Sequence, residues 1–79
     1  MSQTEPELSA CVRRLVTEYF NHLDGEKCSN VHDLVISSVE KPLLEVVLSH
    51  TEGNQTRASE ILGINRNTLR KKMQHYGVK

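Results

Sequence analysis

The densest apolar segment of the chain runs from Val31 to Leu48, and it limits what this sequence can fold into. Its apolar residues are Val31, Leu34, Val35, Ile36, Val39, Leu43, Leu44, Val46, Val47 and Leu48. A helix that is apolar around most of its circumference must be buried on more than one side. A chain of 79 residues with three aromatic side chains has only a small helix to offer as cover. The segment therefore predicts that two copies of the chain interlock as a homodimer.

Pro42 interrupts this segment, and two interpretations are open. Proline removes a helical hydrogen bond and clashes with the carbonyl four residues back, at a cost of about 3 kcal/mol. Two separate helices could meet at Lys41 and Pro42. One kinked helix is preferred, because the apolar positions continue in phase and no Gly, Asn or Asp marks a loop. Such a kink would let the helix curve around its partner.

An amphipathic helix is expected before this segment. Thr4-Glu5-Pro6-Glu7 fits a capping box, with Pro6 in the first turn, and Asp24-Gly25 is expected to end the helix. A polar connection over residues 26–30 follows, in which Ser29 or Asn30 can cap the next helix. The apolar stripe has three- and four-residue steps and contains Leu8, Val12, Leu15, Val16, Tyr19, Phe20 and Leu23.

Two short helices joined by a glycine turn are expected at the C-terminal end. The first covers residues 55–62, and the second begins after Asn65 and runs to His75 or Tyr76. The residues expected to bound these helices are Gly53, Asn54, Gly63, Asn65 and Gly77. The side chains expected to face inward are Ala58, Ile61, Leu62, Ile64, Leu69, Met73 and Tyr76. This arrangement is the pattern of a helix-turn-helix.

The neutral net charge of the chain hides two unlike halves. Residues 1–53 hold four basic and nine acidic side chains, which gives a charge of minus five. Residues 54–79 hold six basic side chains and one acidic side chain, Glu60, which gives plus five. Such asymmetry indicates a polyanionic partner for the basic half.

The outward face of the last helix carries the side chains that a DNA groove requires. With Leu69 set inward, Asn67, Lys71 and Gln74 point outward, and Arg66 and Lys72 lie at the borders. Lysine and arginine donate to guanine, and Asn or Gln can pair with adenine. A solvated basic face would look similar residue by residue. The face, the turn and the charge asymmetry together favour double-stranded DNA as the partner.

Other classes of protein are disfavoured by the sequence. No nucleophile–base pair, paired carboxylates, phosphate loop or metal-ligand spacing stands out, so neither an enzyme nor a cofactor or metal is expected. Cys11 and Cys28 do not form a CxxC motif, and no apolar run has membrane length. A reducing, cytoplasmic location is therefore expected.

The stretch "GNQTRASEILGINRNTLRKKMQHYG", with "EKPLLEVVL" before it, resembles the Fis family, the factor for inversion stimulation. The C-terminal DNA-binding domains of bacterial enhancer-binding regulators share this pattern. The resemblance implies an all-α, four-helix subunit with a C-terminal helix-turn-helix, intertwined as a homodimer. It further implies a nucleoid-associated transcription regulator that bends DNA and reads it mainly by shape, with few base contacts.

The expected organisation has three parts: a short N-terminal arm over residues 1–7, dimerisation helices over residues 8–53, and the DNA-binding unit over residues 54–79. The side chains expected in the dimer core are Leu15, Tyr19, Phe20, Leu34, Val35, Val39, Leu43 and Val47.

The resemblance also implies roles for individual residues. Those expected to read bases are Asn65, Arg66 and Lys71. Those expected to hold phosphates are Asn54, Thr56, Thr68, Arg70 and Lys72. Additional DNA contacts are expected from Gln55, Asn67 and Gln74.

The sequence departs from the family pattern at two places that concern protein partners. Only a few residues stand in place of the longer N-terminal arm, which argues against a recombinase contact. RNA polymerase is a further partner that the resemblance implies, but Glu52 stands where a basic residue can touch DNA near that contact surface, and an acid there argues against the contact.

Two alternatives stay open: a detached C-terminal domain of an enhancer-binding activator, and a helical protein–protein adaptor. The initial Met and the capped first helix favour an independent protein.

Overall fold

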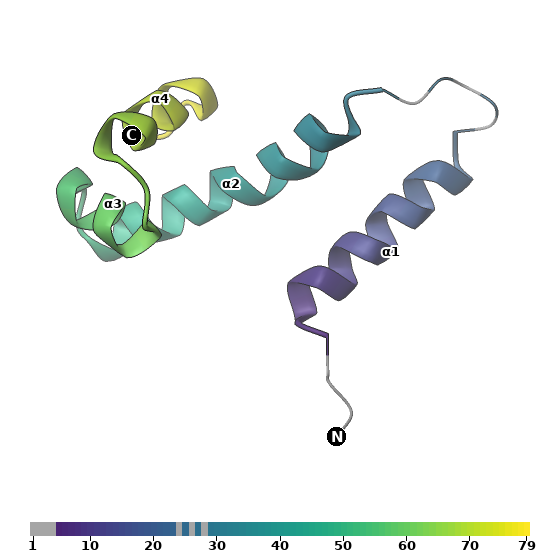
Figure 1. Ribbon diagram of the computed structural model, residues 1–79, viewed down its shortest axis with the longest axis horizontal. Coiled ribbons are helices and arrows are strands. Elements are labelled where there is room, and N and C mark those ends of the chain that lie inside the picture. Colours follow the sequence, from purple (N-terminus) through teal and green to yellow (C-terminus); the bar gives the residue numbers. More distant parts are fainter. Residues whose placement is uncertain (1–4, 24, 26, 28) are drawn as a thin grey trace. The chain divides into compact units, whose positions relative to one another are not determined.

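The computed structural model contains four helices: α1 (Glu7–Asn21), α2 (Val31–His50), α3 (Gln55–Leu62) and α4 (Arg66–Tyr76) (Figure 1). The structure describes residues 5–23, 25, 27 and 29–79, and no strand occurs among them. The predicted all-α, four-helix class is therefore confirmed. The chain divides into two compact units, Met1–Val35 and Ile36–Lys79.

Both ends of α1 differ from the prediction. The N-cap position is held by Pro6 with an extended ψ of 145°, and no side chain caps the helix. The predicted capping residue, Thr4, lies outside the described residues, and Glu5 accepts a hydrogen bond from Arg13 Nε at 2.6 Å instead. At the other end, α1 stops at Asn21, and His22 caps the helix by donating hydrogen bonds to carbonyl groups of its last turn. Both the backbone N–H and the ring Nδ1 of His22 donate to the Glu18 carbonyl.

The apolar face of α1 contains no buried residue. Leu8, Leu15 and Phe20 each expose more than half of their surface. Tyr19 and Phe20 contact one another, with ring centroids 6.1 Å apart. A helix with this pattern needs a further apolar surface for its burial.

The helix α2 is continuous through Pro42, which confirms the interpretation as one helix. The kink at Pro42 stays a prediction. Asn30 precedes the helix with a φ of 60°, and its carbonyl accepts from the Leu34 N–H at 3.0 Å. The apolar residues of α2 divide into three sets. The buried set is Leu44 and Leu48, and the exposed set is Leu34, Ile36, Leu43 and Val46, while Val31, Val35, Val39 and Val47 are half-buried.

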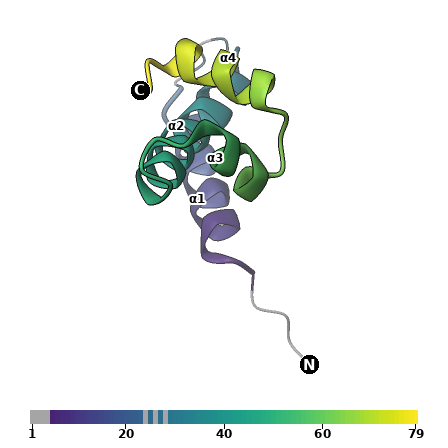
Figure 2. The same cartoon turned by 90° about the vertical axis from the view of Figure 1, so that its left-hand side faces the viewer.

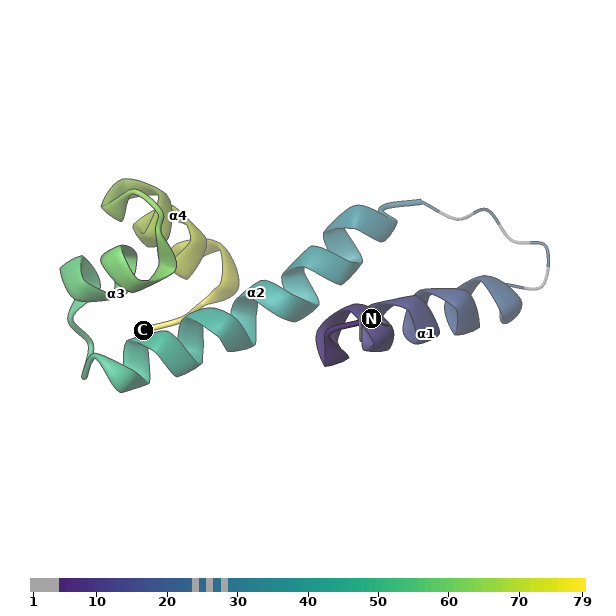
Figure 3. The same ribbon diagram turned by 60° about the horizontal axis from the view of Figure 1, so that its bottom comes forward.

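The buried set of α2 belongs to the core of the C-terminal unit. In Figures 2 and 3, α3 and α4 lie against the C-terminal half of α2, and the end of the chain returns towards α2. This core consists of Leu44, Leu48, Ala58, Leu69, Met73 and Val78. Val47, Leu62, Ile64 and Tyr76 are half-buried and pack against it. The inward positions predicted for α3 and α4 are confirmed, with the exception of Ile61.

Ile61 is exposed over 50% of its surface, so the prediction that it faces inward is wrong. Ser59 lies on the buried face of α3 in its place. The exchange costs little hydrogen bonding, because the Ser59 hydroxyl donates to the Thr56 carbonyl at 2.8 Å. A small side chain at this position lets α3 pack closely against its neighbours.

The turn between α2 and α3 uses two residues with positive φ. Gly53 has a φ of 84°, and its N–H donates to the Leu48 carbonyl at 2.8 Å, as expected for the residue that follows a helix. Glu52 has a φ of 54°, a conformation that costs an L-residue other than Gly, Asn or Asp roughly 1 kcal/mol.

We predict that Glu52→Asn stabilises the protein by about 0.5 kcal/mol, because Asn tolerates the left-handed conformation and avoids the entropy cost of a second glycine. This change corresponds to a rise of roughly 2–4 °C in the unfolding midpoint, to be measured by circular dichroism at fixed protein concentration. Glu45→Gln is the control for the lost charge, since Glu45 lies within α2. An equal rise in both variants would assign the effect to charge.

Candidate nucleic-acid interface

The corner between α3 and α4 is built as the sequence predicts. Gly63 ends α3 with a φ of 74°, and its N–H donates to the Ser59 carbonyl at 2.9 Å. The space around the Cα of Gly63 is open, so its backbone conformation is what calls for glycine. Asn65 is in an extended conformation and accepts from the Asn67 N–H at 2.7 Å, which starts α4.

One face of α4 is anchored and the rest is exposed. Leu69 is fully buried, Met73 nearly so, and Tyr76 packs against the same core. The exposed residues of the helix are Arg66, Asn67, Thr68, Arg70, Lys71, Gln74 and His75. A rigidly held helix that presents three cations and several amide or hydroxyl groups matches the donor and acceptor pattern of a DNA major groove.

The three residues expected to read bases, Asn65, Arg66 and Lys71, are all exposed. The Arg66 guanidinium donates to the hydroxyl of Thr56 at 3.4 Å, so a predicted base reader contacts a predicted phosphate holder. This contact brings the beginning of α3 close to the beginning of α4. Both helix N-termini can then present N–H groups to an anion on the same side.

A small hollow lies beside the start of α3. It has a volume of about 220 Å³ and is lined by Gln55, Arg70, Met73, Gln74 and Val78. Gln55, Arg70 and Gln74, for which separate DNA contacts were predicted, are thus brought together. Asn54 stands just before them and caps α3, with its Oδ1 accepting from the Arg57 N–H at 3.1 Å. A guanidinium and two amides around a hollow suit a phosphate oxygen.

Lys72 differs from the other cations of α4, because it is held in an ion pair. Its Nζ lies 2.8 Å and 3.1 Å from the two carboxylate oxygens of Glu40 on α2. The Tyr76 hydroxyl donates to the same carboxylate at 2.6 Å. Hydrogen bonds from Lys72 and then from Tyr76 hold the pKa of Glu40 below its ordinary value.

Glu40 was not predicted from the sequence as a functional residue. A signal for it was present, because Lys72 and Tyr76 are four residues apart and therefore share a face of α4. A carboxylate inside the apolar segment of α2 is the partner that such a pair requires.

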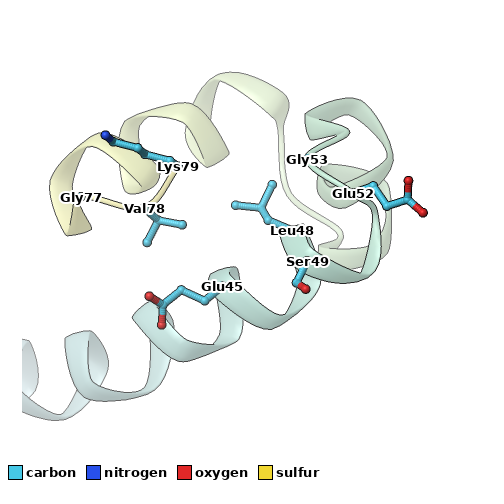
Figure 4. Close-up of a pocket in the computed structure, with 8 residues that line it drawn as sticks. All are labelled: Glu45, Leu48, Ser49, Glu52, Gly53, Gly77, Val78 and Lys79. Atoms are coloured by element: carbon cyan, nitrogen blue, oxygen red, sulfur yellow. The ribbon is translucent and has the colours of Figure 1, made fainter.

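A larger groove of about 570 Å³ lies between the end of α2 and the end of the chain (Figure 4). Its floor is formed by Leu48 and Val78, whose side chains lie between the ribbons in the close-up. Glu45 and Glu52 also line it, with Lys79 as the only cation. Two carboxylates disfavour phosphate there, so the surface suited to DNA is that of α4 and the start of α3.

The described part of the chain contains neither a metal-ligand cluster nor a helix fit to cross a membrane. Among those residues, no group of three or more His, Cys, Asp or Glu side chains is placed to hold a metal ion. Within the same residues, none of the helices has the length and hydropathy needed to span a bilayer.

These features define a helix-turn-helix protein whose second short helix presents a polar, cationic face. Residues 35–76, more than half of the chain, match the family model described as bacterial regulatory protein, Fis family. The chain therefore belongs to the Fis family. Its helix-turn-helix is accordingly a DNA-binding unit, and its general role is the regulation of transcription.

Proposed function

We propose that the protein is a homodimeric, DNA-bending transcription regulator associated with the bacterial nucleoid. The observation that carries the proposal is the exposed face of α4, which concentrates Arg66, Arg70 and Lys71 on a helix anchored by Leu69. In a chain of zero net charge, such a concentration is best explained by a polyanionic ligand.

The uncovered apolar side chains support the dimer. Leu8, Leu15 and Phe20 of α1 are half or more exposed, and Leu34 and Leu43 of α2 are nearly half exposed. Burying one such side chain contributes roughly 1.5–3 kcal/mol, so a second copy that covers these faces would be strongly favoured. The dimer would then present two α4 helices to one duplex.

The DNA contacts are proposed to divide by chemistry. Base edges would be read by Asn65, Arg66 and Lys71, whose side chains lie at the start and on the outward face of α4. The proposed phosphate ligands are Asn54, Thr56, Thr68, Arg70 and Lys72, with support from Gln55, Asn67 and Gln74. For Asn54 and Asn65 the cap uses Oδ1, whereas a DNA acceptor would take a hydrogen bond from Nδ2.

DNA bending is proposed because few of the expected DNA contacts are to bases. Three base readers per subunit supply few direct contacts, so much of the sequence preference would come from how easily the duplex deforms. In the Fis family the two recognition helices are expected to stand closer together than one straight helical turn requires. A duplex with a flexible centre would therefore bind more tightly than one with a stiff centre.

The experiment that tests this function is a salt-titrated binding assay on two short duplexes that differ only in their central segment. We expect binding to both, a steep loss of affinity with salt, and preference for the flexible centre. Gel mobility of permuted fragments measures the bend. Failure to bind either duplex in dilute buffer would refute the function, and binding without any preference or bend would refute its bending part.

We predict that Arg66→Ala lowers affinity by about 1–3 kcal/mol and relaxes the preference at one base position of each half-site. Arg70→Ala, the matched control on the same helix, is expected to weaken binding about equally for all sequences and to reduce the salt slope by roughly one per subunit. Competition binding with a set of single-base variants measures both effects. Sequence-blind losses from both variants would contradict the assigned division.

A further inference from the structure

We propose that Glu40 sets the DNA affinity of the protein by competing with DNA phosphate for Lys72. The inference deepens the proposed function and depends on it, because it concerns the same DNA-facing helix. It adds a residue of α2 to the determinants of binding, although Glu40 is itself an acid and lies outside the helix-turn-helix.

The Glu40 carboxylate is held by two donors, the Lys72 ammonium group and the Tyr76 hydroxyl. Both carboxylate oxygens of Glu40 lie within 3.1 Å of Lys72 Nζ, and Tyr76 adds a hydroxyl donor at 2.6 Å. The side chains of Lys72 and Glu40 are exposed over only 33% and 24% of their surface. An ion pair that is mostly shielded from solvent is screened less by salt than a pair on the open surface.

A carboxylate and a phosphate diester are both oxyanions that accept hydrogen bonds from an ammonium group. Lys72 stands one helical turn after Thr68, a proposed phosphate ligand, on the same edge of α4. A lysine at this place would ordinarily displace one counterion from DNA on binding. With Glu40 attached, its charge is already compensated, and the lysine must leave the carboxylate before it gains a phosphate.

The pKa of Glu40 supports this competition. A glutamate is ordinarily ionised at neutral pH, and hydrogen bonds from Lys72 and Tyr76 lower the pKa of Glu40, which favours its charged form further. The competitor is therefore charged under the conditions in which DNA is bound.

A purely structural role for Glu40 makes the opposite prediction. If the carboxylate only fixed α4 against α2, its removal would misplace the recognition helix and weaken binding. Glu40→Gln separates the two roles, because glutamine keeps the shape and can still accept a hydrogen bond from the Tyr76 hydroxyl but carries no charge.

The experiment compares the wild-type chain with Glu40→Gln, Lys72→Ala and the double variant on one duplex, across a salt series. We expect Glu40→Gln to bind about fivefold more tightly per subunit near 0.15 M salt and to steepen the salt slope by about 0.9 per subunit. When Lys72 is already replaced by Ala, adding Glu40→Gln is expected to change the affinity and the salt slope by no more than about a tenth of the changes seen with Lys72 present. Glu45→Gln removes another carboxylate of α2 and controls for net charge.

Unchanged or weaker DNA binding by Glu40→Gln would overturn the inference. An equal gain in affinity from Glu40→Gln in the Lys72→Ala background, or from Glu45→Gln in the wild-type chain, would also overturn it. If circular dichroism shows that Glu40→Gln loses helix content, the inference is tested with the Lys72→Ala variant instead. Its salt slope is expected to fall by less than that of Arg70→Ala, and equal falls would overturn the inference. A wild-type chain that binds no duplex would refute the proposed function itself, whereas the other failures would leave it standing.

Discussion

Phe20→Asp is expected to separate the proposed dimer into single subunits. Phe20 exposes 52% of its surface within its own chain, so a partner must cover it if the apolar face of α1 is to be buried. Losing that burial costs roughly 1.5–3 kcal/mol per subunit, and an uncompensated carboxylate in an apolar interface costs several kcal/mol more. Since the change occurs twice in a dimer, the dissociation constant should rise by about a thousandfold or more. Sedimentation equilibrium over a range of concentrations measures it.

Ile61→Asp is the matched control for this experiment. Ile61 is exposed to nearly the same extent, 50%, but lies on α3, outside the apolar face assigned to the dimer. The control is expected to keep the mass of the unsubstituted protein. The separated Phe20→Asp subunits should also lose affinity for a full DNA site by about 100-fold, because the two recognition helices no longer bind as one unit. Equal masses for the two variants would place the interface elsewhere.

The C-terminal helices could be predicted from the sequence because their limits are local. Asn54 and Asn65 cap α3 and α4 with their own side chains, and Gly63 and Gly77 end them with positive φ. Each of these interactions spans no more than four residues. The interior of the corner followed from helical spacing, which places Leu69, Met73 and Tyr76 on one face.

The features that the sequence did not reveal depend on distant parts of the chain. That Ser59 and not Ile61 lies on the inner face of α3 depends on which side of the short helix meets α2. The pairing of Lys72 was not predicted, because its partner Glu40 is 32 residues away and the spacing of Lys72 and Tyr76 does not by itself identify that partner. Val78 was missed because it joins the core after the last helix, where periodicity no longer applies.

The dense apolar segment of α2 contains both a feature that could be predicted from the sequence and one that could not. Within its own chain α2 is buried on one side, where Leu44 and Leu48 lie in the core with α3 and α4, and its burial on a further side stays a prediction. Leu34, Leu43 and Val46 remain exposed. Composition could predict two apolar faces, but only the fold could assign one of them to the DNA-binding unit.

Leu69→Ala is expected to cost about 2–5 kcal/mol in the free energy of unfolding, because the substitution leaves a cavity in a core that relaxes only in part. Leu69 is fully buried, and the other buried residues of this core, among those that the structure describes, are Leu44, Leu48, Ala58, Met73 and Val78. Such a loss is a large fraction of the stability of a domain this small. The unfolding midpoint should fall by roughly 8–40 °C when protein concentration is held fixed.

The same substitution tests how DNA binding depends on the anchoring of α4. Leu69 does not face the groove, yet Leu69→Ala should weaken DNA binding in step with the population of unfolded protein, because the Arg66 and Lys71 side chains are positioned by the helix that Leu69 anchors. Ile61→Ala is the control, since truncating a half-exposed residue of α3 should change stability by less than about 0.5 kcal/mol. Thermal unfolding followed by circular dichroism, with binding measured well below the midpoint, separates the two effects. A Leu69→Ala protein with an unaltered midpoint would show that the recognition helix is not held by this core.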